Sequence, residues 1–200
     1  MDEPTQTSPE ADRLPLPDMD RAREAAAELR MKADLDNQPI WRALLRRPAV
    51  AEPIFRLTTA QLFPGSMDTR RRELAIMRVG WLTDCTFEWT QHWHLSRRLG
   101  LSAEELLNVR TGPTCESFDD RDRAVLSAAD DVVAGGCVSA ATWLRLRGLF
   151  DDDECFDTVI TVTTWFFISC IIRSLAISLP QTMAPWPPDG CGPEARGSAG

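Results

Sequence analysis

Four side chains able to transfer protons lie close together in the sequence. Glu73 belongs to one segment, and Cys85, Glu88 and His92 follow in the next. If residues 85–99 form a helix, the last three stand at i, i+3 and i+7 and share a stripe roughly 60° wide. A short turn at residues 83–84 favours antiparallel packing against a helix over residues 68–82. The sequence therefore predicts that all four side chains converge on one cleft of a helical hairpin.

These groups suit proton transfer beside a carbonyl group. His92 is predicted to be the acid/base, because an imidazole has an unperturbed pKa of about 6.5. Glu88 is predicted to be its partner and Glu73 a relay, since a carboxyl group in apolar surroundings has a raised pKa. Cys85 is either a reactive thiol or a side chain that only lines the pocket. In the structural alternative, Glu88 and His92 form a stabilising i, i+4 pair and Glu73 is a buried ion-pair partner.

Three further residues are predicted to contact the substrate. Trp81 and Trp89 could form apolar walls, although tryptophans at such spacings are also common in a core. Arg72 could bind a substrate carboxylate through its guanidinium fork, or lie in a solvated or intersubunit patch.

No metal or cofactor is predicted. His92 and His94 are the two histidines of the chain, and on a helix their rings diverge by about 200°, which is poor for chelation. The chain has no Gly-x-Ser-x-Gly elbow, phosphate-binding glycine loop or dinucleotide fingerprint. A substrate that carries its own carbonyl group would supply the electron sink.

The composition narrows the classes of protein. The 200 residues, 44% of them hydrophobic, suffice for one domain. A net charge of −8 argues against a nucleic-acid partner. Six cysteines without regular spacing, and a polar N-terminal sequence, favour a cytoplasmic protein. The longest apolar stretch, residues 158–172, is shorter than the about 20 residues that cross a bilayer, so no membrane partner is predicted.

Helical signals recur between two ends rich in proline. We expect a disordered or docking arm over residues 1–19, a helical domain over 20–179 and a disordered tail over 180–200. Within the domain, caps and apolar periodicity predict an all-α fold of about seven or eight helices. The last helix, beginning after Asp151, is apolar on nearly every side, so it is either a central core helix or part of an interface with a second copy. We favour self-association.

These motifs carry a resemblance to a known family. The sequence reads Arg-Arg-Glu73-Leu-Ala-Ile-Met-Arg, then Cys85-x-x-Glu88-Trp-x-x-His92, then Leu99-Gly-Leu-Ser-x-Glu-Glu. It resembles the carboxymuconolactone decarboxylase family within the alkylhydroperoxidase-D-like superfamily, over roughly residues 48–179. The resemblance implies an all-helical, oligomeric domain, a dimer, trimer or hexamer, with its site on the motif hairpin near a subunit boundary.

The resemblance also implies a choice of activity. In the peroxidase branch two cysteines form a disulfide, and here Glu88 takes the place of the second cysteine, which disfavours that chemistry. In the decarboxylase branch a Glu/His pair acts without a cofactor. We therefore expect a cofactor-independent, decarboxylase-like lyase acting on a small carboxylated or carbonyl-bearing metabolite. Isomerase, dehydratase or cyclase chemistry at the same site, a thiol-dependent peroxidase and a non-catalytic oligomeric binding protein are the alternatives.

Overall fold

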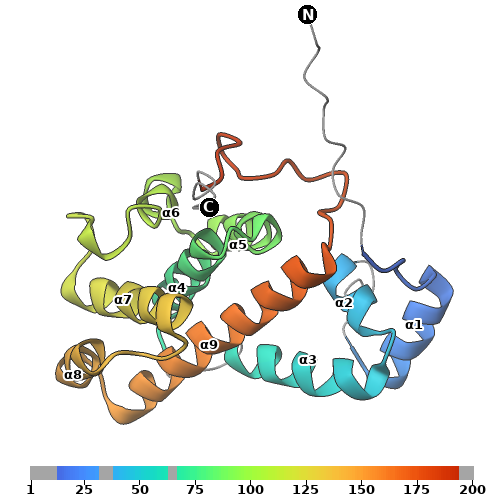
Figure 1. Ribbon diagram of the computed structural model, residues 1–200, viewed down its shortest axis with the longest axis horizontal. Coiled ribbons are helices and arrows are strands. Elements are labelled where there is room, and N and C mark those ends of the chain that lie inside the picture. Colours follow the sequence, from blue (N-terminus) through green and yellow to red (C-terminus); the bar gives the residue numbers. More distant parts are fainter. Residues whose placement is uncertain (1–12, 32–37, 63–66, 194–200) are drawn as a thin grey trace, which may run out of the picture.

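The chain folds into helices joined by short loops (Figure 1). The computed structural model describes residues 13–31, 38–62 and 67–193. Over these ranges there are nine α-helices, one short 3-10 helix and no strand, which confirms the all-α prediction. The helices are α1 (Met19–Glu28), α2 (Pro39–Leu44), α3 (Pro48–Leu62), α4 (Thr69–Leu82), α5 (Thr86–Arg98), α6 (Ala103–Asn108), η2 (Gly112–Thr114), α7 (Asp120–Gly135), α8 (Ala140–Leu149) and α9 (Asp152–Leu175).

Side-chain caps fix where several helices begin. The Asp68 carboxylate accepts a hydrogen bond from the backbone N–H of Arg71 at the start of α4. Ser102 and Glu105 form a reciprocal capping box at α6, and Asp151 opens α9 in the same way. Each cap satisfies backbone donors that have no partner inside the helix.

Helix α4 is the centre of the packing. All of its residues from Arg72 to Gly80 are buried, and it packs against α5, α7 and α9. We expected α9 to be apolar all round and therefore central or intersubunit. Within this chain, α9 buries one face, including Thr158, Trp165 and Ile168, and leaves Phe156 and Phe167 exposed on another. By length and composition α9 could cross a membrane, but half of its most apolar stretch is buried in the fold.

A glycine sets the spacing of the α4–α5 hairpin. A Cβ atom built on Gly80 would lie 3.1 Å from the backbone nitrogen of Trp89 and 3.3 Å from Cβ of Glu88. The turn that follows passes through Asp84, whose φ is 52°, and α5 begins after Cys85. Because a Cβ atom at this position would require α5 to move by a few tenths of an ångström, Gly80 sets how near Glu88 lies to α4.

Described parts of the predicted arm and tail pack on the helical domain. Residues 1–12 and 194–200 lie outside the described residues. In the described part of the predicted arm, the Arg13 backbone N–H donates to the Leu175 carbonyl. In the described part of the predicted tail, Trp186 packs on Trp81 and Trp89. Tryptophan rings supply enough apolar area to hold a proline-rich segment that cannot form a helix of its own.

Candidate active site

The buried centre of the hairpin is a hydrogen-bonded pair of Glu73 and His92. Glu73 Oε2 lies 2.8 Å from His92 Nδ1, so the carboxylate of α4 meets the imidazole of α5. The Ser96 hydroxyl, one turn further along α5, donates to the same Glu73 oxygen at 3.3 Å. Arg72 binds the other oxygen, Oε1, at 3.1 and 3.2 Å. Glu73 has no exposed surface and is therefore held by partners on both oxygens.

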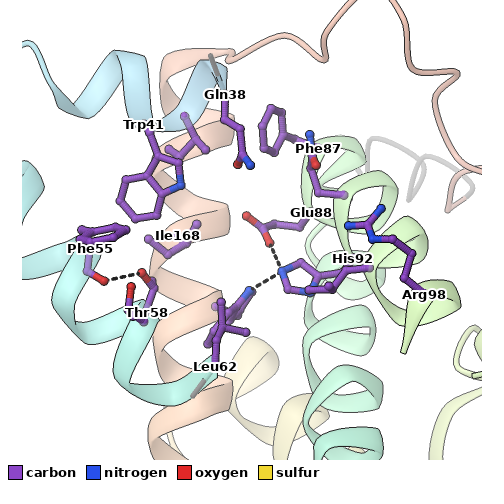
Figure 2. A pocket seen from close by; sticks show the side chains of 15 residues that line it. Gln38, Trp41, Phe55, Thr58, Leu62, Phe87, Glu88, His92, Arg98 and Ile168 are labelled. Carbon is purple, nitrogen blue, oxygen red and sulfur yellow. Dashed lines mark hydrogen bonds and ion pairs between the residues drawn. The ribbon is translucent and has the colours of Figure 1, made fainter. Parts of the chain in front are cut away.

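The second nitrogen of His92 faces two groups. The indole Nε1–H of Trp165, on α9, donates a hydrogen bond to His92 Nε2 at 3.0 Å. Glu88 Oε2 lies 3.5 Å from the same nitrogen (Figure 2). Because the indole nitrogen only donates, Nε2 accepts and is unprotonated in this arrangement. The imidazole then carries its proton on Nδ1 and donates it to Glu73.

The surroundings shift the pKa values of the two carboxyl groups of the site in opposite directions. Burial alone would raise the pKa of Glu73, but the charges and hydrogen bonds of His92 and Arg72 outweigh it and hold that pKa below its usual value. Burial raises the pKa of Glu88, with a further contribution from the charge of Glu73 and against the opposing influence of His92. One carboxylate is thus kept ionised and the other is biased towards its protonated form.

His92 is subject to opposing influences. Burial lowers the pKa of His92, but the charge of Glu73 and its hydrogen bond, followed by the charge of Glu88, outweigh burial and raise it. The Trp165 indole acts against protonation, since its N–H would face the N–H of an imidazolium. His92 and Glu88 therefore compete for one proton across 3.5 Å.

A pocket of about 350 Å³ opens beside Glu88 and His92. Helix α5 forms one wall, and α2, α3 and α9 form the others (Figure 2). Trp41 and Phe55 meet edge to face, with ring centroids 5.4 Å apart, on the side opposite α5. The volume falls within the range of small-molecule sites, which are mostly apolar with a few polar groups. The remaining lining residues are Gln38, Ile40, Thr58, Thr59, Leu62, Phe87, Gln91, Leu95, Arg98, Trp165 and Ile168.

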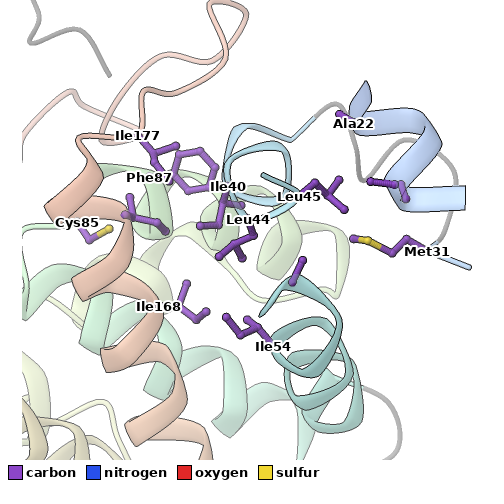
Figure 3. Close-up of a cluster of buried hydrophobic side chains, with 14 residues drawn as sticks. Ala22, Met31, Ile40, Leu44, Leu45, Ile54, Cys85, Phe87, Ile168 and Ile177 are labelled. Carbon is purple, nitrogen blue, oxygen red and sulfur yellow. The ribbon is translucent and has the colours of Figure 1, made fainter. Parts of the chain in front are cut away.

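Cys85 does not join this site as we expected. It precedes α5 with a non-helical backbone, so the helical stripe begins only after it. Its side chain is buried in an apolar cluster with Phe87, Ile168 and Ile177 (Figure 3) and does not line the pocket. Burial, together with the charge of Glu88, raises the pKa of the Cys85 thiol to about 12.

Trp81 and Trp89 lie away from the pocket that we expected them to wall. They pack on Trp93 and Trp186 in a separate cluster, and the Arg110 guanidinium lies 4.8 Å from the Trp81 ring centroid. The 100° step of a helix explains this placement, because Trp89 follows Glu88 by one residue and points to another side of α5. The two tryptophans hold the C-terminal segment.

Arg72 also has a different position from the one we expected. It is buried, and besides Glu73 it donates to the Leu62 carbonyl at 3.1 Å, which joins the end of α3 to α4. With these partners it does not line the pocket.

Two parts of the site were missed from the sequence. Trp165 lies 73 positions from His92 in the chain, and the aromatic pair of Trp41 and Phe55 comes from α2 and α3. Trp165 lies on the buried face of α9, beside Thr161 and Ile168, and the apolar sequence of this helix predicted only that the side chain is buried.

Within the described ranges, no group of three or more His, Cys, Asp and Glu side chains is placed to hold a metal ion.

Comparison with known proteins supports the fold. An uncharacterized peroxidase-related protein from Ralstonia eutropha JMP134, with an alkylhydroperoxidase AhpD core, superposes with a TM-score of 0.71 at 19% identity, covering 86% of this chain and 94% of that one. A peroxidase-related protein from Silicibacter sp. TM1040 gives 0.71 at 15% identity, covering 88% and 96%. The debrominase Bmp8, in complex with 2,3,4-tribromopyrrole, gives 0.65 at 10% identity, covering 81% and 84%.

A family model matches the part of the sequence that contains the α4–α5 hairpin. No curated protein matches the chain by sequence. Residues 48–131 match the model of the carboxymuconolactone decarboxylase family, and this range spans Glu73, Glu88 and His92. Over this range the chain is similar to the carboxymuconolactone decarboxylase family, and the whole domain has the alkylhydroperoxidase-D-like fold.

Proposed function

We propose that this protein is a cofactor-independent acid–base enzyme, a decarboxylase-like lyase acting on a carboxylated, carbonyl-bearing metabolite. The observation that carries the proposal is the buried array of Glu73, His92 and Glu88, of which the last two line a pocket. Acid–base catalysis needs a group whose pKa lies near the working pH and which reaches the substrate. Burial raises the pKa of Glu88 above its usual value, and Glu88 lies on the pocket wall, so it is the carboxyl group that best suits both conditions.

Each residue has a distinct role in the proposed reaction. A substrate carboxylate one carbon away from a carbonyl group breaks its C–C bond, releases CO₂ and leaves the electron pair as an enolate. The Glu88 carboxylic acid donates its proton to the carbon that lost CO₂, and becomes a carboxylate. His92 returns a proton to Glu88 from its Nε2 side after protonation from solvent, while the Glu73 carboxylate stabilises the transient imidazolium. The sum is substrate carboxylate plus one proton, giving the decarboxylated ketone plus CO₂.

The order of the proton carriers differs from our expectation from sequence. There His92 was the acid/base and Glu88 its partner. The Trp165 hydrogen bond occupies His92 Nε2, the imidazole nitrogen beside Glu88, which supports Glu88 as the group that exchanges the proton with substrate. An isomerase would use the same carboxyl group to remove and return a proton beside a carbonyl group.

The test uses benzoylacetate, a β-keto acid with one aromatic ring. We expect the full chain to release CO₂ and form acetophenone, and Glu88→Gln to lower kcat by about 10²- to 10⁴-fold. His92→Ala is expected to lower it similarly. His94→Ala serves as the matched control, because residue 94 lies about 200° round α5 from His92 and does not line the pocket.

Three outcomes separate the possible functions. Exchange of acetophenone methyl protons with deuterated solvent, without CO₂ release from benzoylacetate, would indicate an isomerase instead of a lyase. Equal rates for the wild type and for the combined Glu88→Gln and His92→Ala variant would contradict acid–base catalysis at this site. Peroxide-dependent turnover that is lost in Cys85→Ser would favour the peroxidase alternative.

A further inference from the structure

We infer that the pocket takes an aromatic acid, whose ring system fills the space between α3 and α5 and whose non-reacting anionic group binds Arg98. This inference rests on the proposed function for the reacting end of the molecule, which faces Glu88. It adds the chemical class of the rest of the substrate and names Arg98 as the residue that selects it.

Arg98 lines the pocket and has no hydrogen-bond or ion-pair partner within residues 13–31, 38–62 and 67–193. It lines the pocket from the last turn of α5. Among the residues that the structure describes, no carboxylate or carbonyl group lies within hydrogen-bonding or ion-pair distance of its guanidinium. Its neighbour Arg97, by contrast, donates to the Leu101 carbonyl. An unpaired guanidinium beside a cavity is a ready site for a carboxylate, sulfonate or phosphate group.

The helical register puts Arg98 within one molecule's length of the reacting groups. Gln91, Leu95 and Arg98 stand at i, i+4 and i+7 and form a row next to Glu88 and His92 on the same pocket wall. Arg98 lies ten residues after Glu88, which is about 15 Å along the helix axis, and six residues after His92, which is about 9 Å. Side chains on a helix lean towards its N-terminus, and Figure 2 shows Arg98 beside His92 on this wall. The anion and the reacting carbon therefore belong to opposite ends of one small molecule.

The other walls define the body of that molecule. Trp41, Phe55, Leu62 and Ile168 line the pocket across from α5, and the Trp41 and Phe55 rings meet edge to face. Aromatic walls favour a flat, apolar guest. At about 30 Å³ for each water-sized group, 350 Å³ holds about a dozen non-hydrogen atoms. A bicyclic aromatic acid has this size.

The acidic character of the chain makes the positive charge of Arg98 important for binding an anion. The chain carries a net charge of −8, and Glu73 and Glu88 lie nearby, so an anion approaching the pocket meets a field that repels it. Only a specific positive contact would retain it. Arg98, placed on the pocket wall, provides that contact.

The experiment compares a charged probe with a neutral one of the same shape. Binding of 2-naphthoate and 2-naphthamide to the full chain is measured by isothermal titration calorimetry at pH 7.5. We expect 2-naphthoate to bind about three- to tenfold more tightly, the range of a charge-assisted contact at a partly exposed site. Arg98→Met should remove this preference by weakening 2-naphthoate alone, and Arg98→Lys should keep part of it.

Two controls locate the probe and separate this inference from the proposed function. Arg97→Met removes the same charge from the adjacent position and should keep the preference for 2-naphthoate. Thr59→Trp fills the pocket and should weaken both probes. Equal affinities of the two probes, an unchanged preference in Arg98→Met, or no binding of either probe would overturn the inference. Glu88→Gln should still bind 2-naphthoate, so a failure of the catalytic proposal leaves this result standing.

Discussion

The indole of Trp165 donates a hydrogen bond to Nε2 of His92 at 3.0 Å, while Nδ1 of the same ring lies 2.8 Å from Glu73. These two contacts select one tautomer, with the proton on Nδ1. A residue of α9 and a residue of α4 thus fix the orientation and protonation of a histidine on α5.

Replacing Trp165 by Phe should change how His92 titrates. The variant keeps an aromatic ring and removes the N–H that opposes protonation of Nε2. We expect the pKa of His92 to rise further above its usual value. NMR titration of the imidazole resonances in a His94→Gln background measures it. An unchanged titration curve would show that the indole does not control the imidazole.

Replacing Glu88 by Gln should stabilise the protein more at high pH than at low pH. Burial raises the pKa of Glu88 in the folded state, so the stability linked to its protonated form is fully present below the unfolded pKa of about 4.3. That stability is lost as the pH rises through the folded pKa. The neutral amide avoids this loss. Urea unfolding at pH 4 and pH 8 should show a difference between variant and wild type only at the higher pH, and a constant difference would contradict the assignment.

Replacing Arg72 by Met should destabilise the fold by about 3 kcal/mol, the cost of breaking a buried ion pair. The change leaves Glu73 Oε1 without its partner and frees the Leu62 carbonyl. Arg98→Met removes the same charge from an exposed position and should cost less than about 0.5 kcal/mol. Chemical denaturation of both variants gives the comparison, and similar losses would mean that the pairing of Arg72 contributes little.

Cys85 should resist alkylation. Only the thiolate reacts, and burial raises the pKa of this thiol to about 12. With iodoacetamide at pH 8 we expect peptide mass spectrometry to find label on the exposed Cys137, Cys170 and Cys191 long before Cys85. Rapid labelling of Cys85 in the folded protein would reopen thiol chemistry at this site.

Trp186 should hold the C-terminal segment in place. Its ring contacts Trp81 and Trp89, and the Trp89 indole N–H donates to the Pro187 carbonyl at 2.9 Å. Trp186→Ala should cost about 2 kcal/mol, below the range for a fully buried tryptophan because the side chain is only partly buried. Asp189→Asn, which alters an exposed pair with Arg110, should cost less than about 1 kcal/mol. Limited proteolysis near residue 186 should speed up in the first variant alone.

The α4–α5 hairpin could be predicted from the sequence because the residues that determine it are close together in the chain. The spacing of Glu88 and His92 and the length of the preceding turn determine which side chains meet. The same reasoning placed Cys85 on the stripe because it assumed that residue 85 is helical. In the structure, the first helical residue of α5 is Thr86. One non-helical residue is enough to turn a side chain out of a stripe.

The pocket could not be predicted in the same way. Trp165 and Trp41 reach it from helices far away in the chain, and nothing in local periodicity says which distant face packs on α5. The tryptophans of α4 and α5 were assigned to the pocket for their size alone. Their real partner is Trp186, whose segment reads as a loose tail until its contacts are known.

The aromatic corner of Trp41 and Phe55 stands on helices that carry none of the acid–base groups. In the proposed function, the groups that contact the ring system therefore lie on different helices from the groups that transfer protons. Substitutions in α2 and α3 would then change which substrate the pocket accepts and leave Glu73, Glu88 and His92 in place. Related proteins with this fold could differ in substrate and share one reaction.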